Sequence, residues 1–402
     1  MLKIFIGPNG YGKTYELERI KKKLFDEDNN RKDVIMLGSE LVFADEMKDT
    51  VNNSFLMDYI ITELLVDDEL TSIQKQFEDK LDKLIKDNSD MYNELMDETL
   101  KLNAHERTKD VIAPQKTREY KKLVKINADD LKGSMGSGQK LHFLLRLIEK
   151  SNKQYIFLDE PENHSHPSML HITANLINKL SETKEVYIAT HSPELLNMLN
   201  IDFNNLYIFN DAEYKGPKKI DFKKAVNSLP KNINIENLYS NSKTYYDEEK
   251  LKSNILEIHK KEFMSALFST KVYIVEGIND QLFLKKVLNK SGKQFEQYSI
   301  FPCYGKPHYF PFVEIFNDLG INVVLLFDED KTSNETNNKI NTELQKNKHY
   351  MFTEFLEKEI GYNGDKGDLP KFLDYLTNYN DYEKYFEIVE ELQFRLRTEK
   401  IR

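Results

Sequence analysis

The chain has 402 residues, of which 40% are hydrophobic and 31% charged, enough apolar material for the cores of two or three domains. Its formal net charge of -10 argues against a protein that coats nucleic acid nonspecifically, and its single cysteine, Cys303, excludes a disulfide framework. No apolar run approaches the length of a membrane span, and no secretory signal pattern opens the chain. We therefore expect a cytoplasmic protein that does not contact membranes.

The first half of the chain predicts an α/β domain that carries a helical insertion. The apolar opening MLKIF predicts a strand, followed by a glycine-rich turn, a helix over residues 15–25 and a second strand over 34–37. Residues 54–125 are polar and poor in glycine, with apolar residues at helical spacing, which predicts a helical hairpin or arm. Three further strands are expected between helical stretches, at 155–158, 185–189 and 206–209. This alternation is typical of an α/β fold.

The second half predicts a separate α/β domain. Residues 246–267 are expected to form a connecting helix, and strands are expected at 272–275 and 323–327. We therefore divide the chain into a first domain over 1–245, the connecting helix, and a second domain over 268–402.

A phosphate-binding loop follows the first predicted strand. Residues 7–14 read GPNGYGKT and match the pattern G-x-x-x-x-G-K-[ST] between a strand and a helix. The glycines allow backbone N–H groups to face phosphate oxygens, Lys13 neutralises the β- and γ-phosphates, and the Thr14 hydroxyl binds Mg²⁺. The residues expected to bind ATP here are Asn9, Gly10, Tyr11, Gly12, Lys13 and Thr14.

Two acids follow the buried strand in YIFLDEP, residues 155–161. Asp159 is expected to hold the Mg²⁺ of the ATPase site, and Glu160 is expected to polarise the attacking water. The pair would complete the P-loop as a Walker B motif.

Two more loops extend this ATPase pattern. Residues 133–140 read GSMGSGQK just before a helix, and this signature loop offers a second anion site at Ser137 and Gly138. His191 follows a strand in IATHSPE. The four motifs together resemble the RecF/SMC/OLD branch of ABC-type ATPases. The resemblance implies that His191 contacts the γ-phosphate and that the signature loop meets nucleotide held by another subunit, so we expect a homodimer or a higher homo-oligomer.

Two strands of the second domain end in closely spaced acids. Glu276 and Asp280 lie four residues apart in VYIVEGIND, across a glycine turn that leads into a helix. Asp328 and Asp330 alternate in VVLLFDED, so along an extended chain both side chains can point one way. Clustered carboxylates suit hard divalent cations such as Mg²⁺ or Mn²⁺, and two such ions can promote phosphodiester cleavage.

This second pattern resembles the Toprim domain of the OLD (overcoming lysogenisation defect) family. The resemblance implies an ABC-type P-loop ATPase with a helical insertion, followed by a C-terminal Toprim α/β domain. It implies metal binding by all four acids, with Glu276, Asp328 and Asp330 catalytic. In FTEFLEKEIGYNGDKGDLPKF it implies one further acid and a catalytic lysine. We nominate Glu357 and Lys366, and the alternatives that remain open are Glu354, Glu359 and Lys371.

Three functions are consistent with these motifs. The first is an ATP-binding and ATP-hydrolysing, metal-dependent endonuclease in antiphage defence, like Gabija-type proteins of this family. Its nucleic-acid substrate is expected to be DNA ahead of RNA, with the choice left open by the sequence, and a partner protein encoded nearby is compatible with this function. The second is a nucleotide-dependent sensor or scaffold that acts through a partner effector. The third is a RecF-like DNA repair ATPase, which the Toprim acids argue against because RecF-like proteins lack them.

Overall fold

The computed structural model describes most of both predicted domains. The described residues are 1–27, 33–38, 76, 79, 83, 137–164, 166–210, 216–230, 247–292, 297–330 and 335–390. Apart from three single positions, the predicted arm over 54–125 lies outside the described residues, as does the part of the signature loop before Ser137.

The first sheet has five strands in the order β2-β3-β4-β1-β5. β1 pairs with β5, and β2 with β3, in parallel. The strands are β1 (Leu2–Ile6), β2 (Val34–Leu37), β3 (Tyr155–Asp159), β4 (Glu185–Thr190) and β5 (Leu206–Ile208). Nearly all their residues are buried, as expected for strands whose two faces are covered. All five strands predicted in this half of the chain are therefore present.

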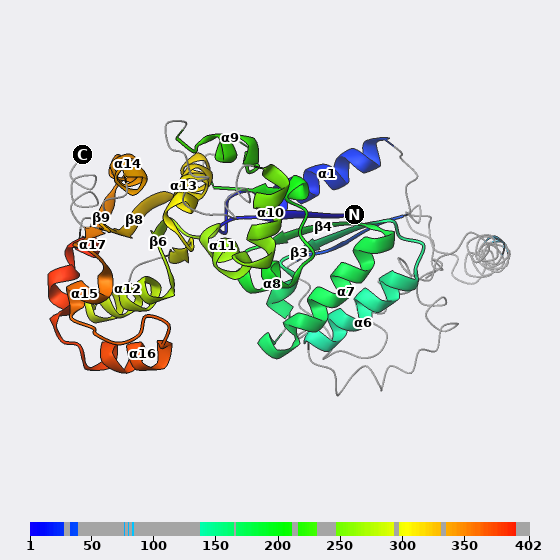
Figure 1. Cartoon of the computed structure of the whole chain (residues 1–402). Helices are drawn as coiled ribbons and strands as arrows, with labels where there is room; N and C mark the ends of the chain where they lie inside the picture. The colour runs from blue at the N-terminus through cyan, green and yellow to red at the C-terminus, as the bar shows by residue number, and fades with distance from the viewer. Residues whose placement is uncertain are drawn as a thin grey trace, which may run out of the picture. The chain divides into compact units, whose positions relative to one another are not determined.

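Helices connect these strands, and α6 and α7 lie side by side in Figure 1. The helices are α1 (Lys13–Glu27), α6 (Ser137–Lys150), α7 (Leu170–Thr183), α8 (Pro193–Met198) and α9 (Phe222–Asn227), with the 3₁₀ turns η4 (Pro161–His164), η5 (Pro167–Met169) and η6 (Phe203–Asn205). Short polar side chains fix where they begin. For example, the Asp221 side chain accepts a hydrogen bond from the Lys224 backbone N–H at 2.8 Å and caps α9.

The predicted connecting segment forms two helices rather than one, α10 (Glu248–Glu257) and α11 (Lys260–Ala266). No glycine or proline marks the break, which falls at Ile258 and His259. The His259 ring is buried and packs against the rings of Phe301 and Phe312, with centroid distances of 5.1 and 5.3 Å. Tertiary packing of this ring therefore accounts for an interruption that local sequence does not signal.

The second sheet has four parallel strands in the order β7-β6-β8-β9. They are β6 (Lys271–Val275), β7 (Tyr298–Pro302), β8 (Asn322–Asp328) and β9 (His349–Phe352). β6 and β8 were predicted, whereas β7 and β9 were not. Because all four strands run in parallel, their carboxyl ends meet at one edge of the sheet, and ligands of such sheets bind at that edge.

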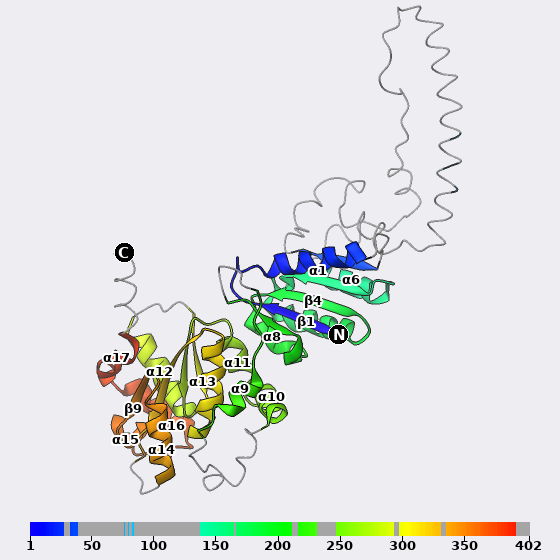
Figure 2. The ribbon, with the colours of Figure 1, turned by 90° about the horizontal axis from the view of Figure 1, so that it is seen from above.

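Helices α12 (Ile278–Lys290) and α13 (Tyr309–Asp318) cover opposite faces of this second sheet, as Figure 2 shows. β7 and β8 lie on opposite sides of β6, so two right-handed crossovers require this arrangement. The remaining elements are η9 (Lys306–His308), α14 (Glu335–Leu344), α15 (Leu356–Ile360), α16 (Leu369–Asn378), η10 (Asp381–Tyr385) and α17 (Glu387–Glu390).

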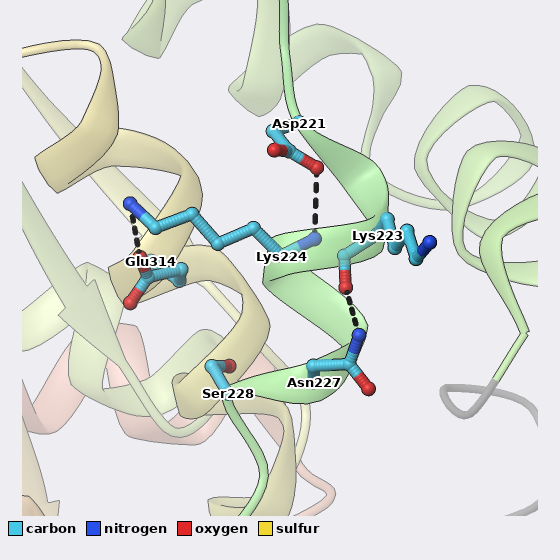
Figure 3. Close-up of a pocket in the computed structure, with 6 residues that line it drawn as sticks. All are labelled: Asp221, Lys223, Lys224, Asn227, Ser228 and Glu314. Atoms are coloured by element: carbon cyan, nitrogen blue, oxygen red, sulfur yellow. Dashed lines mark hydrogen bonds and ion pairs between the residues drawn. The ribbon is translucent and has the colours of Figure 1, made fainter.

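Helix α9 packs on α13. The Lys224 ammonium pairs with Glu314 and with Asp318, each at 2.7 Å, and Figure 3 shows the first pair within a small polar pocket. The pocket's lining side chains belong to α9 and its two flanking residues, together with Glu314.

By density of contacts the chain divides into two compact units, one of Met1 with residues 24–186 and one of residues 2–23 with 187–402. The domain limits at 245 and 268 stay a prediction. No helix in the described part of the chain is both long and apolar enough to cross a membrane.

Candidate active sites

The P-loop follows β1 and has the backbone geometry that its glycines permit. Gly7, Gly10 and Gly12 have φ values of 147°, 83° and 92°, a region that other residues rarely adopt. At Gly7 a Cβ atom would also lie 2.1 Å from the Phe209 carbonyl oxygen, so only glycine fits. The Lys13 side chain is buried and donates to the carbonyl oxygens of Gly7, at 2.9 Å, and Pro8, at 3.0 Å.

The other predicted nucleotide contacts surround this lysine in sequence. Asn9, Gly10 and Thr14 are exposed, whereas Tyr11 and Gly12 are partly buried. A loop with exposed backbone at its tip and a lysine folded back on its own carbonyls is compatible with phosphate binding, because the ammonium can exchange these carbonyls for phosphate oxygens.

Asp159 and Glu160 stand at the end of β3. Asp159 is the buried last residue of the strand. Glu160 has a φ of 49°, a left-handed conformation that residues other than glycine rarely adopt. Its Oε2 accepts a hydrogen bond from Asn163 Nδ2 at 2.8 Å. Strain of this kind is often retained where a side chain must be aimed at a reacting group.

The histidine and signature-loop residues also lie beside element ends. His191 directly follows β4, and the next residue, Ser192, caps α8 by accepting from the Leu195 backbone N–H at 3.1 Å. Ser137 is the first residue of α6, and Gly138 is buried within its first turn. The helix start predicted for the signature loop is therefore present.

In the second domain, Glu276 and Asp280 follow β6. The Asp280 carboxylate accepts a hydrogen bond from the Gly277 backbone N–H at 2.8 Å and so occupies the N-terminus of α12. The Oε2 atom of Glu276 is shielded from solvent and has no hydrogen-bond partner. A buried carboxylate oxygen without a partner is costly, which marks this position as one that a ligand would complete.

Asp328 and Asp330 follow β8, but not in the extended geometry that we expected. Asp328 ends the strand, and its Oδ1 accepts from the Leu356 backbone N–H at 3.0 Å. Asp330 has a φ of 47°, so the chain turns sharply there, and its N–H donates to the Glu354 carbonyl at 2.9 Å. The turn, rather than an extended strand, therefore sets the direction of Asp330, contrary to the alternation predicted from the sequence.

A buried lysine that the sequence analysis did not single out contacts both ends of this turn. Lys306 is only 2% exposed, and its Nζ lies 2.7 Å from Asp330 Oδ2 and 2.5 Å from the Asp328 carbonyl oxygen. It lies in the connection from β7 to α13. The sequence signal available was the Gly-Lys-Pro turn after an unrecognised strand.

Glu357 and Lys366 pair with each other, with Glu357 Oε2 and Lys366 Nζ 3.0 Å apart. Glu357 is buried in the first turn of α15, and its Oε1 accepts from Asn279 Nδ2 at 2.8 Å. Asn279 also donates to the Lys366 carbonyl at 3.1 Å, and its own Oδ1 is buried without a partner. This asparagine, which sequence analysis missed, therefore connects the segment that carries Glu357 and Lys366 to the helix that carries Asp280.

The alternative residues Glu354, Glu359 and Lys371 have other partners. Glu354 pairs with Lys358, and Lys371 pairs with Asp368 at 2.6 Å on an exposed surface. The Glu359 carboxylate accepts from a backbone N–H at 2.6 Å. The geometry therefore favours Glu357 and Lys366 over these three residues.

Glu276, Asp280 and Asp328 interact electrostatically. Burial raises the pKa of Glu276, against the opposing effect of the Lys306 charge. Burial, and then the charges of Asp328 and Glu276, hold the pKa of Asp280 well above its usual range. Burial and the Glu276 charge raise the pKa of Asp328 to about 7. Raised pKa values of this kind report carboxylates that are buried near one another without enough compensating charge.

The carboxylate oxygens of these acids suit a hard divalent cation, although the acids do not converge on one ion position in this structure. Among the described residues, no three His, Cys, Asp or Glu side chains converge closely enough to hold an ion. The acids instead accept hydrogen bonds from neighbouring N–H groups or pair with lysines. Binding would require them to exchange these partners, and the unpartnered oxygen of Glu276 together with the mutual repulsion favours that exchange.

Comparison with known proteins supports both halves of this description. Residues 39–197 match the family described as "AAA domain, putative AbiEii toxin, Type IV TA system". Residues 267–330, which include β6 and β8 with their acids, match "Overcoming lysogenization defect protein-like, TOPRIM domain".

Two relatives share part of the chain. Endonuclease GajA of Bacillus cereus (strain VD045) is 27% identical over 177 residues, which make up 44% of this chain and 26% of the relative. Old nuclease of Escherichia phage P2 is 29% identical over 189 residues, which make up 46% of this chain and 29% of the relative. The matched part thus spans less than a third of either relative. The resemblance to the OLD family is nevertheless confirmed: an AAA-type ATPase domain precedes a C-terminal Toprim domain that matches the OLD-like model.

Proposed function

We propose that the chain is an ATP-binding and ATP-hydrolysing, metal-dependent endonuclease that cuts DNA. The observation that carries this proposal is the group of acids at the carboxyl ends of β6 and β8, with a shielded, unpartnered oxygen on Glu276 and a pKa of about 7 at Asp328. Such an arrangement costs folding free energy unless a cation compensates it, so its presence favours a metal site over a structural one.

Each acid has a defined place in the proposed nuclease site. Glu276 and Asp280 would offer oxygens from the first turn after β6, Asp328 from the end of β8 and Asp330 from the turn after it, with Glu357 completing the set from α15. Bound Mg²⁺ or Mn²⁺ would supply charge stabilisation and a more acidic water.

Two further groups shape this site without binding the metal. Lys366, held 3.0 Å from Glu357, would stabilise negative charge as it develops on the phosphate. Asn279 fixes the positions of both residues through its amide N–H groups.

The ATPase site would work as in ABC-type P-loop enzymes. Lys13 would exchange its loop carbonyls for phosphate oxygens, with Thr14 and Asp159 as Mg²⁺ ligands. Glu160 would orient the attacking water, and His191 would contact the γ-phosphate.

Ser137 and Gly138 would contact nucleotide on a second copy of the chain, which is why the proposal includes a homodimer or a higher homo-oligomer. A cytoplasmic role in antiphage defence, with a partner protein encoded nearby, rests on the family resemblance. A phage plaque assay on cells that express the chain would test that role.

Cleavage assays test the nuclease proposal directly. Purified protein is incubated with supercoiled plasmid, linear DNA and RNA, with Mg²⁺ or Mn²⁺, and with and without ATP. We expect DNA cleavage that requires metal and is lost in Glu276→Gln, while ATP hydrolysis is kept. Glu383→Gln, which makes the same change on an exposed surface, should cleave like the wild type. A folded protein that cuts no DNA or RNA under any nucleotide condition contradicts the proposal.

A second candidate is a nucleotide-dependent sensor or scaffold. It is favoured by one observation: in the described part of the chain no three acids are poised around an ion position. Lys306 and Lys366 pair with two of the acids. This candidate predicts ATP-dependent assembly without cleavage. Light scattering with and without ATP, alongside the cleavage assay, separates it from the nuclease.

A further inference from the structure

Tyr304 is an exposed aromatic residue in the loop that follows β7. It is 49% exposed, and its ring stacks on the His259 ring, with the centroids 5.4 Å apart and the planes 26° apart. The His259 ring is buried and packs in turn against the rings of Phe301 and Phe312. The four rings thus form a continuous aromatic contact that runs from the core of the second domain to solvent at Tyr304.

The backbone at Tyr304 has a conformation that aromatic residues seldom adopt. Its φ is 56°, in the left-handed region, where glycine and asparagine fit readily and a bulky side chain is an outlier. The stack on His259 offsets part of this strain, but it occupies only one face of the ring. Stability alone therefore favours a smaller residue in this turn, and a tyrosine is better explained by a ligand that contacts its exposed face.

The loop that carries Tyr304 lies at the carboxyl edge of the second sheet, beside the proposed nuclease site. The preceding residue, Cys303, donates its backbone N–H to the carbonyl oxygen of Val275, the last residue of β6, at 2.9 Å. Two residues after Tyr304, the Lys306 ammonium lies 2.7 Å from the Asp330 carboxylate. The loop is therefore held on both sides of Tyr304 by the strand ends that carry the acids, so a strand with a phosphate at this edge would bring a neighbouring nucleotide to the ring.

The exposed ring suits a nucleobase better than a phosphate. Aromatic side chains stack on bases of any sequence, because every base has a flat face. Burial, and then the charge of the Glu262 carboxylate, raise the pKa of the Tyr304 hydroxyl. That carboxylate would repel a phosphate but not a neutral base. Because both faces of a paired base are covered within a duplex, only an unpaired base can stack on Tyr304.

Resting on the proposed nuclease function, we infer that Tyr304 is a substrate-binding residue that stacks on an unpaired base beside the phosphate to be cut, so that the site takes single-stranded or locally unpaired DNA. His259 supports the ring from its buried side and fixes its orientation. The ring then determines which nucleotide lies next to the acids. Tyr304 itself takes no part in bond cleavage.

Binding to strands with and without bases tests this inference. The full chain, in Ca²⁺, is titrated into a labelled oligothymidylate or an abasic strand with the same number of phosphates and followed by fluorescence anisotropy, and a gel confirms that the strands stay intact. We expect the wild type to bind the oligothymidylate about 10-fold more tightly than the abasic strand. Tyr304→Asn, which suits the left-handed backbone, should bind both strands equally, and Tyr304→Trp should keep the preference. The control Leu373→Ala, which shortens another exposed apolar side chain, should match the wild type.

A duplex arm tests whether the base must be unpaired. Annealing the oligothymidylate to its complement should remove the effect of Tyr304→Asn, because paired bases offer no free face. An equal loss of affinity on duplex and single strand contradicts the inferred substrate class. A wild type without a preference for bases, or a folded Tyr304→Asn that keeps the preference, overturns the role of Tyr304. If Tyr304→Asn does not fold by circular dichroism, Tyr304→Leu, which also lacks a ring, decides in its place.

Two further measurements separate this inference from other accounts. Light scattering that shows a smaller oligomer in Tyr304→Asn, with the base preference kept, would assign the ring to a contact between copies of the chain and overturn the inference. The cleavage assay judges the nuclease by itself. DNA cleavage by a wild type that shows no base preference overturns only the role of Tyr304, whereas a Tyr304-dependent preference without cleavage overturns only the nuclease.

Discussion

Replacing Asp328 by asparagine should stabilise the metal-free protein while removing its response to metal. The side chain is largely buried at the end of β8 beside Glu276, and these surroundings raise its pKa to about 7. Asparagine is nearly the same shape, and its Oδ1 can keep the hydrogen bond that the Leu356 N–H now donates at 3.0 Å. The substitution therefore removes the charge with little change in packing.

The size of the effect follows from the pKa. A carboxyl group with a folded pKa of about 7, against its ordinary 3.8, binds its proton more tightly in the folded state. Stability is therefore lost as pH rises from about 4 to about 7, and it stays low above that range. At about 1.4 kcal/mol for each pKa unit, the full cost is roughly 4 kcal/mol. Burial is the largest cause of this cost and the Glu276 charge is the next, and Asp328 titrates together with its neighbouring acids, so we expect Asp328→Asn to recover about 2 kcal/mol of it.

Thermal unfolding in EDTA measures this prediction. At about pH 8 the Asp328→Asn protein should melt about 4–8 °C above the wild type, and the difference should shrink toward pH 4. Millimolar Mg²⁺ should raise the melting temperature of the wild type but not of the variant. Asp374→Asn, on the exposed face of α16, should change neither result. A variant that melts below the wild type in EDTA would show that the acids are not destabilising one another, and the electrostatic argument would fail.

Other substitutions test the remaining parts of the proposal. Lys13→Ala should abolish ATP binding in a fluorescent-nucleotide assay, whereas Glu160→Gln should keep binding but trap unhydrolysed ATP; hydrolysis at the wild-type rate would show that another residue activates water. Gly7→Ala should cost about 1–3 kcal/mol and lose ATP binding, because its Cβ would lie 2.1 Å from a backbone carbonyl oxygen; wild-type affinity in this variant would contradict the P-loop geometry. Lys366→Ala should slow cleavage about 10²-fold while calorimetry shows metal binding largely kept, and a loss of metal binding would instead assign the lysine a ground-state role.

The elements that carry acids could be predicted from sequence because their signals are local. An apolar run that ends in Asp or Glu identified β3, β6 and β8 within one or two residues of their observed bounds. The P-loop was equally local, since glycine spacing, lysine and threonine all fall within residues 7–14. Such patterns need no knowledge of the tertiary structure.

What escaped prediction depends on contacts between distant segments. Lys306 reaches Asp330 across 24 positions of sequence, and Asn279 reaches Glu357 across 78. A single lysine or asparagine carries no local sign that it will be buried, so neither stood out. β7 and β9 were missed for a related reason: β9 in particular is short and mostly only partly buried, and both are defined by pairing with β6 and β8.

Both candidate sites break local rules in the same way. Glu160 and Asp330 each take a left-handed backbone conformation just after a strand end, at φ values of 49° and 47°. Neither is glycine, so each position stores strain that the surrounding structure must offset. In the Toprim site the strain adds to the repulsion among acids and to the cost of burying Lys306. Three unfavourable terms at one edge of a sheet are not expected from stability alone, so their coincidence supports the proposal that this edge binds a cation and acts on a phosphate.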